Sequence, residues 1–105
     1  MTDAPALVIT DARERDRYEA TREGVLAGFA EYTTTTEMVV FTHTEVLPGY
    51  EGQGVAGTIV RHALDDVRDR GLSALAVCPF VLAWIRRHPE YAGLEYRSRT
   101  RPGVD

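Results

Sequence analysis

Residues 51–58 read Glu51-Gly52-Gln53-Gly54-Val55-Ala56-Gly57-Thr58. This glycine-rich stretch follows an extended segment, residues 38–46, and leads into an amphipathic helix. Glycine lacks a Cβ atom, so it lets the backbone turn tightly and approach a ligand closely. The first turn of a helix offers N–H groups that have no partner within the helix, and it carries a partial positive charge. The stretch therefore predicts a cradle for an anion, with phosphate or pyrophosphate as the natural ligand.

The residues downstream of this stretch predict a strand–helix–strand unit followed by a second helix. Apolar residues recur at helical spacing over residues 55–67, and Gly71 is suited to end that helix. Residues 72–77 form an apolar run typical of a buried strand. Pro79 suits the first position of a second helix, which we expect to end near residues 88–89.

The residues upstream predict the rest of the sheet. Residues 7–9 indicate a first strand, and Glu23-Gly24 is a turn pair that joins residues 17–22 to residues 25–32 in an antiparallel hairpin. We expect the charged run 11–17 to form a solvated turn. The fold class is therefore α/β in the α+β sense, with a mixed, mostly antiparallel sheet and two main helices.

The composition fits a single small domain that handles small molecules. The chain has 105 residues, of which 44% are hydrophobic, so we expect one domain over residues 1–105 with a flexible tail at residues 97–105. The net charge of −4 argues against binding to nucleic acid or to an anionic membrane. All 12 basic residues are arginine, so no lysine is present for a P-loop or a Schiff base, and the cradle must act through backbone N–H groups.

The chain has one cysteine, Cys78, and its first residues show no charged segment followed by an apolar one. A lone cysteine cannot form an intramolecular disulfide, and the N-terminal pattern differs from that of a secretory leader. We therefore expect a reducing, cytoplasmic location.

The side chains of residues 38–46 follow the two-residue period of a strand. A regular strand places Val39, Phe41, His43 and Glu45 on one face and the intervening residues on the other. His43 and Glu45 should therefore point in the same direction. Without further information, a solvated glutamate and a hydrogen-bonded edge histidine explain this pair as well as a catalytic role does.

Three sequence blocks, in this order and at this spacing, resemble the GNAT superfamily of N-acetyltransferases, which bind acetyl-coenzyme A. The blocks are His43-Thr44-Glu45-Val46, then Gly52-Gln53-Gly54-Val55-Ala56, and then Cys78-Pro79-Phe80-Val81 with Arg86-Arg87-His88-Pro89-Glu90-Tyr91. The resemblance is closest to a short, single-domain subfamily with a Cys-Pro-Phe segment. It implies a minimal GNAT-like fold in which the strand before the cradle splays from the strand after the first helix.

The resemblance implies acetyl-CoA as the co-substrate, without a metal, and a pyrophosphate held by the glycine-rich stretch. The implied contacts are the N–H groups of Gln53, Gly54, Val55, Ala56 and Gly57, with the Thr58 hydroxyl as an extra donor. The superfamily signature is Gln/Arg-x-x-Gly-x-Gly/Ala, and the chain departs from it at Glu51. A carboxylate there would repel phosphate, so we expect it to point outward. The alternative is a tight turn that binds nothing.

The pantetheine arm of the coenzyme is implied to lie in the slot between the splayed strands. Backbone groups near Thr44, Glu45 and Val46 would pair with the pantetheine amides as with an added strand, and one N–H would polarise the thioester carbonyl. Cys78 and Phe80 are implied to line the slot.

Acetyl transfer to an amine requires the amine to be neutral, and a lysine-like amine has a pKa of roughly 10.4. A general base is therefore expected. Glu45 is the first choice, with His43 as its partner or as an alternative base, acting directly or through a water molecule.

Cys78 precedes Pro79 and is expected at the N-cap of the second helix, where the helix dipole stabilises negative charge. Three roles stay open for it: a proton donor or positioning group for the departing thiolate, a nucleophile that carries the acetyl group, or a buried packing residue. Many superfamily members have a tyrosine general acid on the second helix, but Trp84 occupies that place here. The acid is therefore unassigned, with Tyr91 a weaker candidate than Cys78.

The leading interpretation is an N-acetyltransferase that acts on the primary amine of a small molecule, peptide or protein. The alternatives are a non-catalytic module that binds coenzyme A or acyl-CoA, and an α/β interaction domain without a ligand. The chain lacks the inserted helices that wall the acceptor pocket in larger superfamily members. We therefore expect an open acceptor side, which either takes a protein or peptide amine or is completed by a second subunit in a homodimer.

Overall fold

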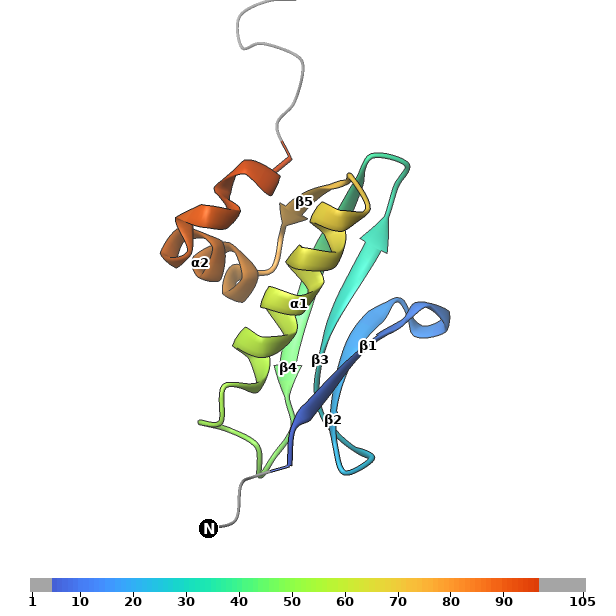
Figure 1. Ribbon diagram of the computed structural model, residues 1–105, viewed down its shortest axis with the longest axis vertical. Helices are drawn as coiled ribbons and strands as arrows, with labels where there is room; N and C mark the ends of the chain where they lie inside the picture. Colours follow the sequence, from blue (N-terminus) through green and yellow to red (C-terminus); the bar gives the residue numbers. More distant parts are fainter. Residues whose placement is uncertain (1–4, 97–105) are drawn as a thin grey trace, which may run out of the picture.

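The computed structural model describes residues 5–96 and shows a five-stranded sheet with helix α1 lying across one face (Figure 1). The strands are β1 (Leu7–Ala12), β2 (Arg17–Arg22), β3 (Val25–Thr34), β4 (Met38–Val46) and β5 (Ser73–Ala76). The helices are α1 (Val55–Asp69) and α2 (Pro79–Arg87), with two short 3-10 segments, η1 (Arg13–Arg15) and η2 (Pro89–Leu94). The strand order is β1-β2-β3-β4-β5, antiparallel as far as β4 and parallel between β4 and β5. This arrangement confirms the predicted α+β fold.

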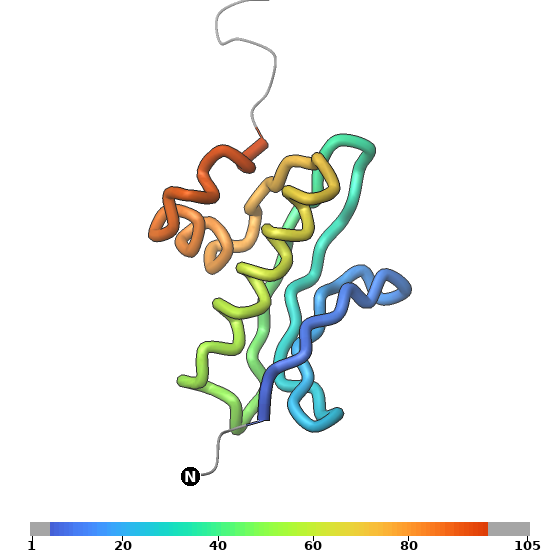
Figure 2. Tube along the Cα trace, in the orientation of Figure 1, coloured from blue at the N-terminus to red at the C-terminus, as the bar shows by residue number. Residues whose placement is uncertain are grey.

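The β2–β3 hairpin turns at Glu23-Gly24, as predicted. Arg22 pairs with Val25, and Glu23 and Gly24 have φ angles of 52° and 79°. Two successive residues with positive φ match the twist of a two-residue hairpin turn, and glycine adopts such a conformation without strain. The hairpin turn lies at the same end of the sheet as the glycine-rich stretch (Figure 2).

The charged run between β1 and β2 is only partly the solvated turn that the sequence indicated. β1 extends to Ala12, and residues 13–15 form η1. Asp11 Oδ1 accepts a hydrogen bond from the Tyr32 hydroxyl at 2.5 Å, so this carboxylate ties β1 to β3. The charge pattern of residues 11–17 does not indicate this contact, because Tyr32 lies 21 residues from Asp11 in the sequence.

Helix α1 begins at the glycine-rich stretch and packs an apolar stripe on the sheet. Its buried residues are Val55, Ile59, Val60, Ala63, Leu64 and Val67. Gly71, with a φ of 70°, follows the helix, and the N–H groups of Gly71 and Leu72 donate to the carbonyls of Arg68 and Val67. This ending satisfies carbonyl groups that the last helical turn leaves free, and it confirms the predicted role of Gly71.

A β-bulge in β4 changes the predicted assignment of its faces. Tyr32 of β3 pairs with Phe41, whereas the neighbouring Glu31 pairs with His43, so Thr42 is an extra residue on β4. An extra residue reverses the facing of every side chain that follows it, relative to a regular strand.

The residues of β4 that face α1 and the core are Val39, Phe41, Thr44 and Val46. His43 and Glu45 project from the opposite side of the sheet, called here the far face. The predicted grouping of Val39 and Phe41 with His43 and Glu45 is therefore wrong. The prediction that His43 and Glu45 point in the same direction is confirmed, because their side chains are in contact.

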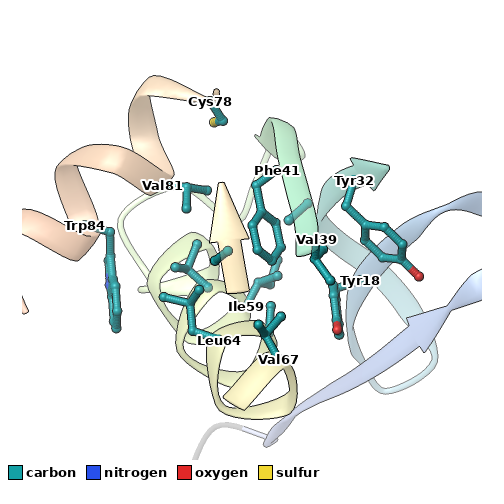
Figure 3. Packing of buried hydrophobic residues seen from close by; sticks show 14 of the residues in the cluster. Tyr18, Tyr32, Val39, Phe41, Ile59, Leu64, Val67, Cys78, Val81 and Trp84 are labelled. Carbon is teal, nitrogen blue, oxygen red and sulfur yellow. The ribbon is translucent and has the colours of Figure 1, made fainter. Parts of the chain in front are cut away.

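The core lies between the sheet, α1 and α2, as the close view in Figure 3 shows. The buried residues of α2 are Val81, Trp84 and Ile85. Cys78 is the N-cap of α2, Pro79 is its first residue, and the helix ends at Arg87, as predicted. The segment η2 that follows was not predicted, and its Tyr91 is buried in the same cluster. The predicted tail, residues 97–105, lies outside the described residues.

Candidate active site

The parallel strands β4 and β5 separate halfway along β4. Met38–Phe41 pairs with Ser73–Ala76. The Phe41 carbonyl oxygen then accepts hydrogen bonds from the N–H groups of Val77 and Cys78, at 3.0 and 2.9 Å, and the chain turns into α2. The predicted splayed strand pair is confirmed. Among the described residues, no strand accompanies residues 42–46 on this side, so this part of β4 has a free edge.

The free edge of β4 presents the backbone groups of Thr44 and Val46. The Leu47 N–H donates to the Ala27 carbonyl on β3 at 2.8 Å. In an antiparallel pair, successive residues direct their N–H and C=O groups to alternate edges of the strand. The groups of Thr44 and Val46 therefore point to the edge that β5 has left, which is the geometry that an added strand requires.

The turn between β4 and α1 holds three glycines in the left-handed region. Gly49, Gly52 and Gly54 have φ angles of 94°, 75° and 75°, and Gly54 is the N-cap of α1. Within residues 5–96, the N–H groups of residues 53–57 have no hydrogen-bond partner, and the first turn of α1 holds no acidic residue. Unshared N–H donors in a positive potential are the arrangement that binds anions.

Two side chains of this turn fold back onto its backbone. The Thr58 Oγ1 donates to the Gly54 carbonyl at 2.8 Å, so its proton is committed within the helix. The role of Thr58 as an extra phosphate donor stays a prediction, and it requires the hydroxyl to release this hydrogen bond. The Glu51 Oε1 accepts from the Gly49 N–H at 2.9 Å, which fixes the carboxylate against the turn.

His43 and Glu45 form a hydrogen-bonded pair on the far face. His43 Nε2 lies 3.1 Å from Glu45 Oε1, and the two side chains are 53% and 49% exposed. Their cross-strand neighbours on β3 are Glu31 and Phe29, and the rings of Phe29 and His43 lie 6.1 Å apart. The pair is thus open to solvent and joins a carboxylate to an imidazole, the groups most often used to move a proton.

Cys78 lies on the other side of β4 from that pair. Its side chain is buried, and its thiol donates to Thr44 Oγ1 at 3.5 Å. No hydrogen bond within the described range joins the thiol to His43 or Glu45, whereas a nucleophilic thiol needs a base within reach. Phe80, the residue that follows Pro79 in α2, is 37% exposed. The structure therefore separates the predicted site residues, with His43 and Glu45 on the far face and the Cys78 thiol on the core side.

The two aromatic residues considered as general acids are engaged elsewhere. Trp84 is buried, and its ring stacks on His88 with centroids 3.7 Å apart. The Tyr91 hydroxyl donates to Asp65 Oδ1 at 2.7 Å and accepts from Arg61 at 3.1 Å. Burial, together with the hydrogen bond to Asp65, raises the pKa of Tyr91, so the phenol retains its proton. Both residues join α1 to α2 and η2.

One contact of the glycine-rich turn was missed by the sequence reasoning. Arg22, the last residue of β2, donates from Nη1 to Gln53 Oε1. The two residues are 31 positions apart and belong to different predicted segments, so no local pattern signals the contact. It brings a guanidinium group to the turn that precedes α1.

A hollow of the surface, with a volume of about 420 Å³, lies between β1 and α1. It is lined by Leu7, Ile9, Thr58, Arg61, His62 and Asp65, and Thr58 is the single predicted site residue among them. Across residues 5–96, no three His, Cys, Asp or Glu side chains are grouped so as to hold a metal ion. None of the helices in that range is long and apolar enough to cross a membrane.

The sequence of the chain is similar to a known protein family and to a curated protein. The family model of GCN5-related N-acetyl-transferases matches residues 17–94, which run from the start of β2 to the end of η2. Streptothricin acetyltransferase from Streptomyces lavendulae is 31% identical over 93 residues, which cover 81% of this chain and 49% of that protein. The chain thus spans about half the length of this curated relative.

Solved structures share the fold at low sequence identity. The NMR structure of a GCN5-like putative N-acetyltransferase from Staphylococcus aureus has a TM-score of 0.67 at 17% identity and covers 94% of this chain and 97% of that one. The ribosomal-protein-S18-alanine N-acetyltransferase from Escherichia coli has a TM-score of 0.60 at 19% identity and covers 69% of this chain and 50% of that one. The family match extends over most of the chain and all but the first strand of the fold. The chain therefore belongs to the family of GCN5-related N-acetyltransferases.

Proposed function

We propose that this chain transfers an acetyl group from acetyl-CoA to a primary amine. The observation that carries the proposal is the junction, at one end of β4, of a free strand edge with a helix N-terminus whose N–H groups are unshared. The edge at residues 44–46 suits the amides of a pantetheine arm, and residues 53–57 suit a pyrophosphate. Coenzyme A joins these two chemical groups in one molecule.

A coenzyme bound in this way brings its thioester to the free edge of β4. Cys78 and Thr44 are in contact on the core side of that edge, and they wall the slot. His43 and Glu45 stand on the far face. The two substrates therefore approach β4 from opposite sides, with the thioester carbon reached across the free edge.

The far-face pair prepares the amine for attack. A lysine-like amine arrives mainly as ammonium, because its pKa is roughly 10.4. Glu45, hydrogen-bonded to His43, accepts one proton from it, directly or through a water molecule. The neutral nitrogen then attacks the thioester carbon, so that a C–N bond forms and the C–S bond breaks.

The departing coenzyme does not require a protein acid. A thiol has a pKa of roughly 8.5, so its thiolate is a competent leaving group near neutral pH. The extra proton on the attacking nitrogen passes to that thiolate as the amide forms. This route is consistent with the engagement of Trp84 and Tyr91 in contacts between helices.

The acceptor is proposed to be a positively charged amine. On the far face, His43 has two carboxylates as neighbours, Glu31 across the strand pair and Glu45 on its own strand. Arg17, which lies over Phe29 on this face, is already paired with Glu19, so the two carboxylates beside His43 attract an ammonium group. Streptothricin, for which the relative from Streptomyces lavendulae is named, belongs in the first panel of amines to be tested.

The experiment is a measurement of thiol release from acetyl-CoA with a panel of primary amines. We expect an amine-dependent rate that falls about 100-fold in Glu45→Gln, because a general base contributes about 10²–10⁴ to the rate. Glu37→Gln, an exposed carboxylate between β3 and β4, is the matched control and should retain the wild-type rate. If coenzyme A binds but no amine raises thiol release, the chain is instead a coenzyme-binding module.

A further inference from the structure

We infer that Arg22 is a positioning residue for the coenzyme, which acts through Gln53 to hold the glycine-rich turn in its anion-binding shape. The inference rests on the proposed function, because it assigns a role within the same coenzyme site. The contact between the two side chains is the observation from which it starts.

The glycine-rich turn needs an external support. Gly49, Gly52 and Gly54 all have positive φ, and a side chain built at any of the three would meet nothing within 4 Å. No tight packing therefore imposes these conformations, and glycine loses more conformational entropy on ordering than any other residue. Hydrogen bonds from side chains must supply the order instead.

Two such hydrogen bonds arise within the turn itself. The Gly49 N–H donates to Glu51 Oε1 at 2.9 Å, and the Gly49 carbonyl accepts from Gln53 Nε2 at 3.2 Å. Both polar groups of Gly49 are thus bound by side chains of the turn. These bonds shape the turn, but they do not fasten it to the rest of the molecule.

Arg22 makes the connection to the sheet. Its Nε donates to the Pro5 carbonyl at 2.9 Å, and its Nη1 donates to the Gln53 side-chain oxygen. The backbone of Arg22 is itself held between Leu7 of β1 and Val25 of β3. The Gln53 amide therefore receives Arg22 at its oxygen and binds Gly49 through its nitrogen, which forms a continuous chain from the sheet to the turn.

The charge of Arg22 also suits this place. Within residues 5–96, Arg22 has no carboxylate partner, whereas Arg13, Arg15 and Arg17, which lie in or next to the β1–β2 connection, each have at least one. Glu51 puts a negative charge in the turn at the signature position that is usually neutral or cationic. Arg22 brings a positive charge to the same turn through Gln53, and the donors of its planar guanidinium join two acceptors at once.

This chain of contacts determines how much conformational freedom the glycine-rich turn loses when coenzyme A binds. A turn that already presents the N–H groups of residues 53–57 loses little freedom when it binds a pyrophosphate. A turn released from the sheet must be ordered by the ligand, so affinity falls. The chemical step on β4 is unaffected, because Arg22 touches neither His43 nor Glu45.

The first test is isothermal calorimetry with coenzyme A, paired with steady-state turnover. Arg22→Gln should bind coenzyme A about tenfold more weakly, about 1.4 kcal/mol, while turnover at saturating acetyl-CoA stays within twofold of wild type. Arg13→Gln is the matched control, because it makes the same charge change at the opposite end of β1, where the Arg13 side chain is paired with Asp11 rather than with the glycine-rich turn. It should bind like wild type.

A double-mutant cycle separates positioning from direct contact with phosphate. If Arg22 acts through Gln53, the variant with both Arg22→Gln and Gln53→Ala binds no more weakly than either single variant, and Arg22→Lys does not restore affinity. Additive losses, or full rescue by lysine, would overturn the positioning role. Gln53→Ala keeps the test decisive if Arg22→Gln fails to fold.

The outcomes also distinguish this inference from the proposed function. Wild-type affinity for coenzyme A in Arg22→Gln would refute the positioning role of Arg22 but would not contradict the proposed coenzyme site. Absence of binding by the wild-type protein would remove the coenzyme site, and the role of Arg22 with it.

Discussion

Cys78 and His43 lie on opposite sides of β4. The thiol contacts Thr44 on the core side, whereas His43, the residue before Thr44, projects from the far face and contacts Glu45. The β-bulge at Thr42 causes this arrangement, because the extra residue turns the Thr44 side chain toward the core and the His43 side chain away from it. A base and a thiol separated by a strand cannot form the pair that activates a nucleophilic cysteine.

The first prediction concerns the route of the acetyl group. Incubation of the protein with acetyl-CoA in the absence of an amine should leave Cys78 unmodified in mass spectrometry, because among residues 5–96 no base is hydrogen-bonded to its thiol. Cys78→Ala should lower turnover by less than tenfold, through loss of packing at the wall of the slot. A stable acetyl adduct on residue 78, together with inactive Cys78→Ala, would establish a covalent route instead.

The second prediction concerns Gly28, where β3, β4 and α1 meet. A Cβ atom at this position would lie 2.8 Å from the Glu45 carbonyl oxygen and 2.9 Å from Val55 Cγ1. Gly28→Ala must therefore displace β4 or the first turn of α1. We expect a loss of about 1–3 kcal/mol in the free energy of unfolding, measured with urea.

The control for Gly28→Ala is Gly93→Ala. A Cβ atom at Gly93 meets nothing within 4 Å, and its φ is not positive, so this variant should unfold within about 0.5 kcal/mol of wild type. Equal stability of the two variants would show that the close approach of β3, β4 and α1 at Gly28 is absent in solution.

The third prediction concerns alkaline pH. Burial, and then the hydrogen bond to Asp66, raises the pKa of Tyr18 far above its ordinary value of roughly 10. The folded chain then keeps a proton that the unfolded chain loses, so the stabilisation is complete below pH ~10 and declines as the pH rises above it. Tyr18→Phe removes this proton, and its stability should decline less steeply, by up to about 1.4 kcal/mol per pH unit.

The check is urea unfolding of both proteins between about pH 8 and pH 11.5, the range that brackets the ordinary pKa of tyrosine. Parallel stability curves for wild type and Tyr18→Phe over that range would mean that the phenol ionises equally in the folded and unfolded chains. Tyr32, whose pKa is raised by burial and by Asp11, contributes a decline of the same sign to both proteins and cancels in the comparison.

The elements set by local chemistry were predictable from the sequence. Gly54 and Gly71 bound α1 because each adopts a positive φ that other residues resist, and Pro79 opens α2 because its missing N–H has no partner there in any case. The Glu23-Gly24 turn set the hairpin register for the same local reason as far as Thr21, where the pairing of β2 with β3 shifts by one residue. These signals depend only on neighbouring residues.

The features that depend on distant partners were not predictable. The bulge at Thr42 follows from how β4 pairs with β3, and no residue type at that position announces it. The contact of Arg22 with Gln53 joins residues 31 positions apart. The sequence therefore indicated which residues form the site, whereas the face of β4 on which each lies became clear only from the pairing of the strands.

The most direct test of the account is an NMR titration of ¹⁵N-labelled protein with coenzyme A, followed through its backbone amides. We expect the largest shifts at residues 53–57, whose N–H groups are unshared, and at Thr44 and Val46 on the free edge of β4. Shifts confined to other regions, or none at millimolar coenzyme, would contradict the proposal that this junction holds the acetyl donor.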